Sequence, residues 1–263
     1  AEDINKQLFY TRNKEKKDKA IHIWQPHVDK FGKVWVGSAN GLFYIDEQDT
    51  ALYAYPKYNE YEAILKGHTV YYFHENEAGI WLATSVGIFL LDYDKGLVQH
   101  YHTAGEGIKH LVHNHIAHIH EDKYDWFWLA SKGGGLIHWN PKTGEQKQFT
   151  KNNGLYNNMI YAAYSDDYGQ LWLPSNYGLM RFDKKTHEAI VYLKEHGLPD
   201  LEFNTASHYQ ATDGQLYFGG IHGTIGFHPR DFVPKTATTA IQITSFQKQN
   251  HSEETYINDI NSV

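Results

Sequence analysis

The chain has 263 residues, enough for one large domain or two small ones, and its 41% hydrophobic residues can form a sizeable core. An aromatic content of 15%, together with 22 glycines, favours many short strands and tight turns. A formal charge of −7 argues against a general nucleic-acid or anionic-membrane surface, and the lack of cysteine excludes disulfides, thiolate nucleophiles and cysteine-bound zinc.

The N-terminal region shows no targeting segment. Ala1, Glu2 and Asp3 lack the basic-then-apolar layout of a secretory signal, and no stretch of the sequence approaches 18 apolar residues. Residues 7–11 have the pattern of the fourth strand of a repeat whose first three strands are missing. We therefore expect the chain to be a piece of a longer protein.

From residue 32 onward an internal repeat organises the chain. An aromatic anchor recurs at intervals of 44 to 47 residues, and a glycine follows each anchor by six or seven residues. The third repeat has the longer spacing, because Gly133 or Gly134 is inserted there. This regularity indicates five structural repeats. Their anchors are Trp35, Trp81, Trp128, Trp172 and Tyr217.

Each repeat predicts four short strands: one before the anchor, the anchor strand, an apolar strand after the glycine turn, and a closing strand. Four antiparallel strands in about 45 residues are typical of a β-propeller blade. The anchor is then expected to pack between neighbouring blades, and the turn glycine to adopt a positive φ. Strands before the anchor are predicted at 68–74, 116–120, 160–164 and 206–210, and closing strands at 52–55, 97–101, 146–149 and 189–193.

The fifth repeat is weak. Its anchor is Tyr217, Thr224 replaces the aliphatic residue after the turn, and no clear fourth strand follows His228. Two explanations fit: residues 7–11 complete the fifth blade and close the ring, or they belong to a blade outside the chain.

The fold class predicted is all-β. Residues 1–233 are expected to form a β-propeller of about five four-stranded blades, alone or as part of a larger seven-bladed ring. Residues 234–263 are expected to form a linker and then, at 241–249, the first strand of a β-sandwich domain.

Three stretches carry a resemblance to a known family. The pattern at 166–183, with its Leu-Trp-Leu core and Arg-Phe-Asp end, resembles the two-component regulator propeller repeat. The phrase Gly-Leu-Pro-Asp-Leu-Glu-Phe-Asn at 197–204 is similar to a loop of that family, and Ile-Thr-Ser-Phe-Gln-Lys at 243–248 is similar to the opening of its tyrosine-rich β-sandwich. The resemblance covers about residues 5–250.

In that family such repeats form the periplasmic, extracytoplasmic sensor region of hybrid sensor histidine kinases. The resemblance therefore implies a non-catalytic sensor segment that responds to an oligosaccharide or another small polar ligand, without a cofactor. The partners that it implies are the remaining blades and the β-sandwich of a full-length inner-membrane receptor. A homodimer is compatible with this role. Nucleic acid is not expected as a partner. A propeller enzyme (a lyase or a glycoside-active enzyme) and a protein-interaction scaffold remain alternatives.

Polar residues recur where the chain enters the innermost strand of each repeat, near the expected opening of the central channel. They are predicted either to bind a polar ligand such as a sugar or to cap the turn by bonding their own backbone. These residues are Lys19, His68, Asn114, Asn158 and Asn204. Two tyrosines in predicted loops, Tyr156 and Tyr177, are further ligand-binding candidates, because aromatic rings stack on the apolar faces of sugars.

Two kinds of chemistry find weaker support. Among the 18 histidines, His118 and His120 are expected on the same face of a strand, as two metal ligands can be. No carboxylate or third histidine lies at a spacing that would complete a metal site. We therefore favour histidines that are packed or solvated rather than metal-bound. Glycoside hydrolysis needs two carboxylates about 5–10 Å apart. Asp200 and Glu202 lie beside the loop phrase but have no defined partner, and we predict no catalytic residue.

Overall fold

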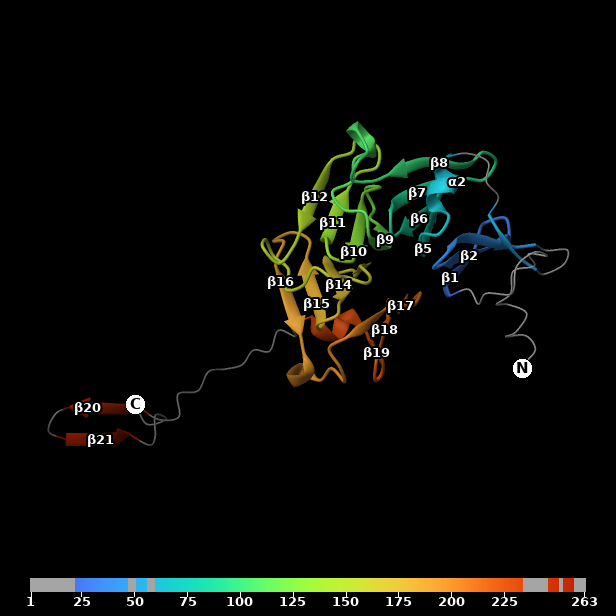
Figure 1. The fold of residues 1–263 in the computed structure, drawn as a ribbon. Coiled ribbons are helices and arrows are strands. Elements are labelled where there is room, and N and C mark those ends of the chain that lie inside the picture. The colour runs from blue at the N-terminus through green and yellow to red at the C-terminus, as the bar shows by residue number, and fades with distance from the viewer. Residues whose placement is uncertain (1–21, 47–50, 56–59, 234–245, 251–252, 258–263) are drawn as a thin grey trace, which may run out of the picture. The chain divides into compact units, whose positions relative to one another are not determined.

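The computed structural model describes residues 22–46, 51–55, 60–233, 246–250 and 253–257. Its strands form separate antiparallel sheets, each made of consecutive strands that pair in sequence order (Figure 1). Each of five successive sheets contains one of the aromatic anchors, so the sequence repeat and the sheet are the same unit. These five sheets are the blades of a β-propeller, which confirms the predicted fold class.

Blades 1 to 4 have four strands each. Blade 1 contains β1 (Ile23–Val28), β2 (Val34–Ser38), β3 (Gly41–Ile45) and β4 (Leu52–Ala54), and blade 2 contains β5 (Val70–Asn76), β6 (Gly79–Thr84), β7 (Gly87–Asp92) and β8 (Gly96–Tyr101). Blade 3 contains β9 (Ile116–Glu121), β10 (Phe127–Ser131), β11 (Gly135–Trp139) and β12 (Gln146–Phe149), and blade 4 contains β13 (Tyr164–Ser165), β14 (Gln170–Pro174), β15 (Leu179–Asp183) and β16 (Ala189–Tyr192).

Blade 5 has three strands in the described part of the chain: β17 (Phe203–Gln210), β18 (Leu216–Gly220) and β19 (Gly223–Phe227). A 3-10 helix, η3 (Pro229–Phe232), follows where a fourth strand would begin. The anchor Tyr217 is 37% exposed, unlike the four tryptophans, so the expected packing between blades is wrong for this one. Residues 7–11, which were expected to complete this blade or another one, lie outside the described residues.

The tryptophan anchors pack between blades as predicted. Trp81 of blade 2 shares a core with blade 3, with ring centroids 4.9 Å from Phe127 and 6.1 Å from Trp139. Trp128 of blade 3 contacts Phe182 of blade 4 at 5.9 Å. The hydrophobic core is therefore a series of layers between adjacent sheets rather than one central cluster.

A carboxylate or amide before each tryptophan anchor orders the turn and in three blades also binds the anchor. In blade 4, Asp166 accepts hydrogen bonds from the backbone N–H groups of Tyr168 and Gln170, and Trp172 Nε1–H donates to its Oδ2 at 2.9 Å. Blade 3 is the exception, because Asp122 contacts His138 instead. Trp128 Nε1 has no hydrogen-bond partner among the residues described.

The second turn of every blade requires its glycine. Gly87 and Gly135 have φ values of 116° and 76°, in the region that favours glycine. An added Cβ at either position would lie 2.1 Å from the carbonyl oxygen of Tyr101 or Phe149. The predicted positive φ is confirmed in all five repeats.

The predicted first strand of blade 4 is mostly absent. Residues 160–164 were expected to be a strand, but β13 contains only Tyr164 and Ser165, with an isolated bridge from Ile160 to Ser175. Pro174 ends the neighbouring strand and lacks the N–H that a regular antiparallel ladder would use. Its carbonyl still accepts a bond from Tyr161 N–H at 2.9 Å.

The chain divides into two compact units, Ala1–Asp231 and Phe232–Val263. In the second, the described residues form a hairpin of β20 (Phe246–Asn250) and β21 (Glu253–Ile257). The helices are short: α2 (Glu60–Leu65), η1 (Gly107–Lys109), η2 (Lys194–His196) and η3. No helix in the described ranges has the length and hydropathy to cross a membrane.

Candidate functional site

The first strands of the blades approach one another at the centre of the propeller. β1 contacts β5, β5 contacts β9, and β17 of the last blade also reaches β5. Side-chain contacts join the start of one strand to the start of the next and the end to the end, so these strands run in the same direction. The site predicted from sequence lies at their starting end.

Bulges place two aromatic residues at this end. The pairing of β1 with β2 shifts after Ile23, and that of β5 with β6 shifts after Val70, so Trp24 and Tyr71 are extra residues in their strands. A β-bulge turns such a side chain out of the regular alternation. The two rings meet edge to face with centroids 5.3 Å apart.

Trp24, Tyr71, His115 and Lys132 form what we call the aromatic–lysine cluster. His115 stacks on Tyr71 at 5.2 Å, and the Tyr71 hydroxyl lies 2.7 Å from His115 Nε2. Lys132 Nζ lies 5.1 Å from the ring centroid of Tyr71 and 6.0 Å from that of Trp24. Blades 1, 2 and 3 each contribute to the cluster.

The positive charge of this cluster belongs to Lys132. Burial lowers the pKa of His115 to about 4, assisted by the charges of Lys132 and His113, so the His115 ring is neutral at neutral pH. Burial also lowers the pKa of Lys132 from its ordinary 10.5. The Lys132 ammonium donates to Thr205 Oγ1 of blade 5 at 3.4 Å.

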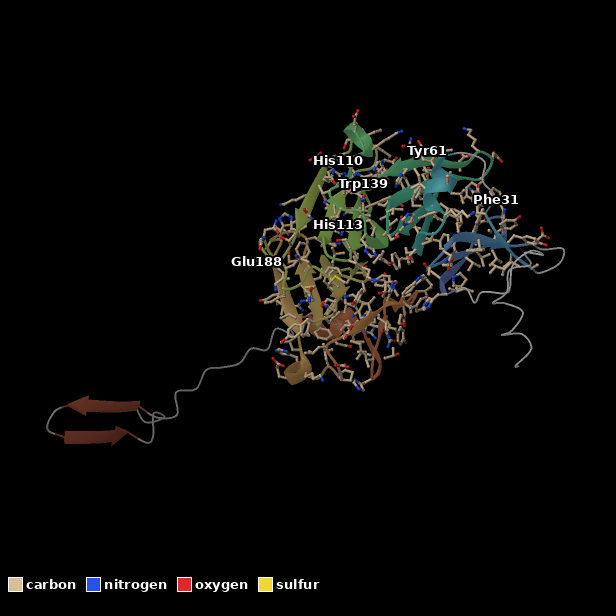
Figure 2. All side chains as sticks on the ribbon, viewed as in Figure 1. Phe31, Tyr61, His110, His113, Trp139 and Glu188 are labelled. Atoms are coloured by element: carbon tan, nitrogen blue, oxygen red, sulfur yellow. The ribbon has the colours of Figure 1, made fainter. Side chains whose placement is uncertain are left out.

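The turn that follows Lys132 contains glycine and is packed against His113. His113, labelled in Figure 2, packs on Gly134 so closely that an added Cβ there would lie 2.5 Å from its ring. His113 Nε2 also lies 3.2 Å from the Lys132 carbonyl oxygen. The inserted glycine of the third repeat therefore shapes the turn that carries Lys132.

Asn114 and Asn158 tie down the loops that precede them. Asn114 Oδ1 accepts a bond from Thr103 N–H at 2.8 Å, and Asn158 Oδ1 accepts one from Lys151 N–H at 2.8 Å. The Asn158 carbonyl also accepts the N–H of Gly133, next to Lys132. Asn114 thus binds a loop residue eleven positions before it, and Asn158 binds one seven positions before it. Contact of either side chain with a ligand stays a prediction.

The other strand-start candidates are more dispersed. His68 and Asn204 are exposed, and Asn204 Nδ2 reaches the carbonyl of Gly220 at 3.4 Å. Lys19 lies outside the described residues. Within the part of the chain that the structure describes, no hydrogen bond joins any two of these candidates.

Tyr156 and Tyr177 lie on two loops that meet. Each tyrosine is 53% exposed, and their neighbours Asn157 and Asn176 are joined by a hydrogen bond of 2.7 Å. Two exposed rings on linked loops could present a platform for a sugar.

A second cluster lies deeper along the first strands and consists of Tyr72, His118, Tyr164 and His208, which we call the axial cluster. Ring centroids of His118 lie 4.0 Å from Tyr72, 4.8 Å from Tyr164 and 4.9 Å from His208. His118 is 1% exposed, and burial lowers its pKa well below the ordinary value. This cluster packs four blades together around neutral rings.

The two histidines considered as metal ligands, His118 and His120, lie in different surroundings. His118 faces this cluster, and its Nδ1 accepts a bond from Ala163 N–H at 3.4 Å. Burial lowers the pKa of His120 to about 4, with the Lys184 charge as the next cause. Across the described residues, no three histidine, aspartate or glutamate side chains are arranged to hold a metal ion.

The carboxylate candidates are engaged in ordinary contacts. Asp200 binds His222 and Lys194, and hydrogen bonding by His222 and by the Leu201 backbone is the main reason that its pKa falls to about 2. Glu202 is exposed near Tyr161, whose pKa it raises after the larger effect of burial. An ionised, cation-bound Asp200 is not set up to donate a proton.

Lys132 and Tyr71 are the site residues that sequence reasoning missed. The sequence could have pointed to Lys132, because this residue directly precedes the inserted glycine at which the third repeat departs from the others. Trp24 stands outside the repeated anchor positions, so the repeat gave no reason to select it. Their meeting depends on two bulges, which alternation patterns do not locate.

No protein-family profile matches the chain. Over 185 residues, 68% of its length, the chain is 25% identical to a curated relative from Formosa agariphila named Histidine kinase P4, and the match covers 13% of that protein. The chain therefore spans a small part of this relative.

Solved structures show the same fold. The extracellular domain of the hybrid two component system BT3049 from B. thetaiotaomicron matches with a TM-score of 0.61 and 20% identity, covering 92% of this chain and 40% of that one. That of BT4673 from the same organism matches with a TM-score of 0.65 and 19% identity, covering 85% and 28%. PorZ, a surface component of the type-IX secretion system of Porphyromonas gingivalis, matches at 0.57 and 15%, covering 85% and 34%.

These matches agree with the family resemblance that residues 166–183 indicate. Two of the structural neighbours are extracellular domains of two-component systems, and the sequence relative is named a histidine kinase. At these identities the structures establish the propeller fold, which other kinds of surface protein also use.

Proposed function

We propose that the chain is an extracytoplasmic ligand-sensing segment of a two-component receptor and that its ligand is an oligosaccharide. The observation that carries this proposal is the likeness of 85–92% of the chain to extracellular domains of two-component systems. The histidine kinase relative supports the same context. The segment would pair with further blades and a β-sandwich in a longer membrane protein.

The starting end of the first strands is the proposed binding surface. Trp24, which is partly exposed, offers an aromatic face for the apolar side of a sugar ring and packs on the buried Tyr71, while His115, Lys132 and Thr205 add polar groups close to these rings. A few convergent polar groups among aromatic walls are the usual features of a small-molecule site.

We further propose that the segment binds without catalysing a reaction. His118 and His208, whose pKa values are lowered by burial, are packed in the axial cluster, and Asp200 is bound by His222 and paired with Lys194, so neither provides a paired acid and base. A bound ligand would then act by changing how the propeller is placed against its neighbouring domain, a rigid-body signal.

A thermal-shift screen of the whole 263-residue chain against neutral and acidic oligosaccharides tests the proposal. A ligand that binds the folded state raises the melting temperature by mass action, so we expect a reproducible rise for one glycan class. Chromatography of the mixtures should recover that glycan intact. Glycan breakdown would favour the lyase or hydrolase alternative, and no rise with any glycan would favour the scaffold.

A further inference from the structure

Among the residues that the structure describes, Lys132 is a partly buried cation without an anionic partner. Its Nζ makes one polar contact with these residues, 3.4 Å to Thr205 Oγ1, and otherwise faces the rings of Tyr71 and Trp24. No ion pair joins Lys132 to any aspartate or glutamate of the described ranges. The causes of its lowered pKa agree, because burial acts there without an opposing carboxylate.

The lack of an anion here is unusual on physical grounds. An ammonium has three N–H donors, and removing its charge from water is costly unless an anion or hydrogen bonds compensate. Aromatic faces compensate in part, by about 0.5–2 kcal/mol for such a contact. One long bond to a hydroxyl leaves donor capacity unused.

The repeat shows that this charge is specific to one blade. A small residue lies at or directly after the end of each anchor strand, and the residue that follows it can be compared between the blades. It is Ala39 in blade 1, Ser85 in blade 2, Lys132 in blade 3, Asn176 in blade 4 and Ile221 in blade 5. Blade 3 alone has a charged residue there and also has the inserted glycine. A repeat that departs from its own pattern at one place often does so for function.

Other positive groups do not replace Lys132. His115 is neutral at neutral pH, as its pKa of about 4 requires, and His113 is turned toward the Lys132 carbonyl and Gly134. The chain carries a net charge of −7, so an anion has little general attraction to it. Recognition of an anion at this end would depend on this single ammonium.

We propose that the aromatic–lysine cluster binds an anionic group on a sugar, a carboxylate or a sulfate, and that Lys132 selects acidic oligosaccharides over neutral ones. This inference rests on the proposed function as an oligosaccharide sensor. The partly exposed Trp24 takes the apolar face of the sugar ring, the buried Tyr71 supports Trp24 and Lys132, and the Lys132 ammonium, assisted by the Thr205 hydroxyl, takes the anion.

Isothermal titration calorimetry of the 263-residue chain at low salt tests the inference. The probes are oligomers of galacturonic, mannuronic and glucuronic acid, sulfated galactose oligomers, and the carboxyl-reduced or desulfated counterpart of each. We expect an acidic probe to bind at least about tenfold more tightly than its neutral counterpart and to weaken as salt rises. The uronate and sulfate arms identify which anion is recognised.

Variants at Lys132 assign the preference to this residue. K132M keeps an apolar stem of similar length and should remove the preference for the acidic probe, while K132R should retain most of it. K109M, at an exposed lysine of η1, is the matched control and should bind as the unaltered chain does. Unchanged melting temperatures establish that the variants are folded.

Each remaining outcome overturns a defined statement. Equal binding of acidic and neutral probes, or an unchanged preference in K132M, would overturn the inference and leave the sensor proposal standing. Absence of binding by every probe, acidic and neutral, would overturn the proposed function together with the inference.

Discussion

The tryptophan anchors differ from one another in a single hydrogen bond. Trp172 donates to Asp166, whereas Trp128 has no partner for Nε1 among the described residues, because Asp122 is taken by His138. Both side chains are buried in the layers between blades. They therefore allow the contribution of the hydrogen bond to be separated from that of packing.

We expect Trp172→Phe to destabilise the protein more than Trp128→Phe. Both changes remove similar volume, but the first also removes a hydrogen bond to a charged acceptor, worth about 1.5–3 kcal/mol. Urea unfolding should show a free energy of unfolding lower by about 2 kcal/mol in Trp172→Phe than in Trp128→Phe. Equal losses would mean that the indole–aspartate bond adds nothing to stability.

The turn glycines allow strain to be separated from steric clash. Gly135 and Gly169 both have positive φ, 76° and 84°, yet an added Cβ meets the Phe149 carbonyl at 2.1 Å in the first case and nothing within 4 Å in the second. Gly169→Ala should cost about 1 kcal/mol from backbone strain alone, and Gly135→Ala at least about 3 kcal/mol. The midpoints of urea unfolding measure both. Similar losses of stability in the two variants would mean that the turn at Gly135 shifts enough to relieve the contact with the Phe149 carbonyl.

At this scale, the sequence could predict the anchors and turn glycines because they repeat with fixed spacing. It could not assign the hydrogen bond of each anchor, because His138 competes for Asp122 in one blade alone. It could not find the pairing of Lys132 with Tyr71, because these residues belong to different blades and are 61 positions apart in the chain.

Strands could be predicted where local pattern and partner strand agree. The closing strand expected at 146–149 is β12, with the same bounds. The strand expected at 160–164 is reduced to two residues, because its partner ends in Pro174 and cannot complete the ladder. The bulges at Trp24 and Tyr71, which build the candidate site, likewise depend on the partner strand.

Neighbouring first strands are also joined at their finishing end by histidine–carboxylate pairs. His27 of β1 lies 2.9 Å from Glu75 of β5, and His74 of β5 lies 2.8 Å from Glu121 of β9. Glu75 also accepts bonds from the Tyr93 hydroxyl and the Lys30 N–H. Although partial burial would raise the pKa of Glu75, these bonds lower it overall.

A double-mutant cycle on His27→Ala and Glu75→Ala measures the first of these junctions. We expect a coupling energy of about 0.5–1 kcal/mol in urea unfolding, as for partly exposed pairs. The pair His27→Ala and Glu121→Ala is the control and should be additive, because Glu121 contacts His74 instead. Additivity in both cycles would mean that the His27–Glu75 contact does not stabilise the blade junction.

The blades of the propeller pack around histidines whose pKa values are lowered by burial. Burial lowers the pKa of His118 well below its ordinary value, and lowers those of His120 and His208 to about 4. The charges near His118 are those of His208, His120 and His74, so no carboxylate there favours protonation. In the unfolded chain each ring titrates near pH 6.5.

Stability is therefore expected to fall as the pH drops from about 6.5 toward 4. In that interval the unfolded chain binds protons that the folded chain does not, so lowering the pH favours unfolding by up to about 1.4 kcal/mol per pH unit for each such histidine. Below about pH 4 the folded rings of His120 and His208 also become protonated, and their contribution levels off. The shifts of His120 and His208 together amount to several kcal/mol by this relation, a large share of the stability of a typical domain.

Urea unfolding at pH 7.5, 6.5, 5.5 and 4.5 measures this dependence, and a variant assigns it. His120→Gln removes one partly buried ring, so its free energy of unfolding should decline less steeply between pH 6.5 and 4.5, by about 1 kcal/mol per pH unit. His110→Gln, at an exposed histidine, is the matched control and should keep the original slope. Because the slope and not the absolute stability is compared, a loss of packing in His120→Gln does not affect the result. Parallel curves for all three proteins would contradict a His120 ring that stays neutral in the folded state down to about pH 4.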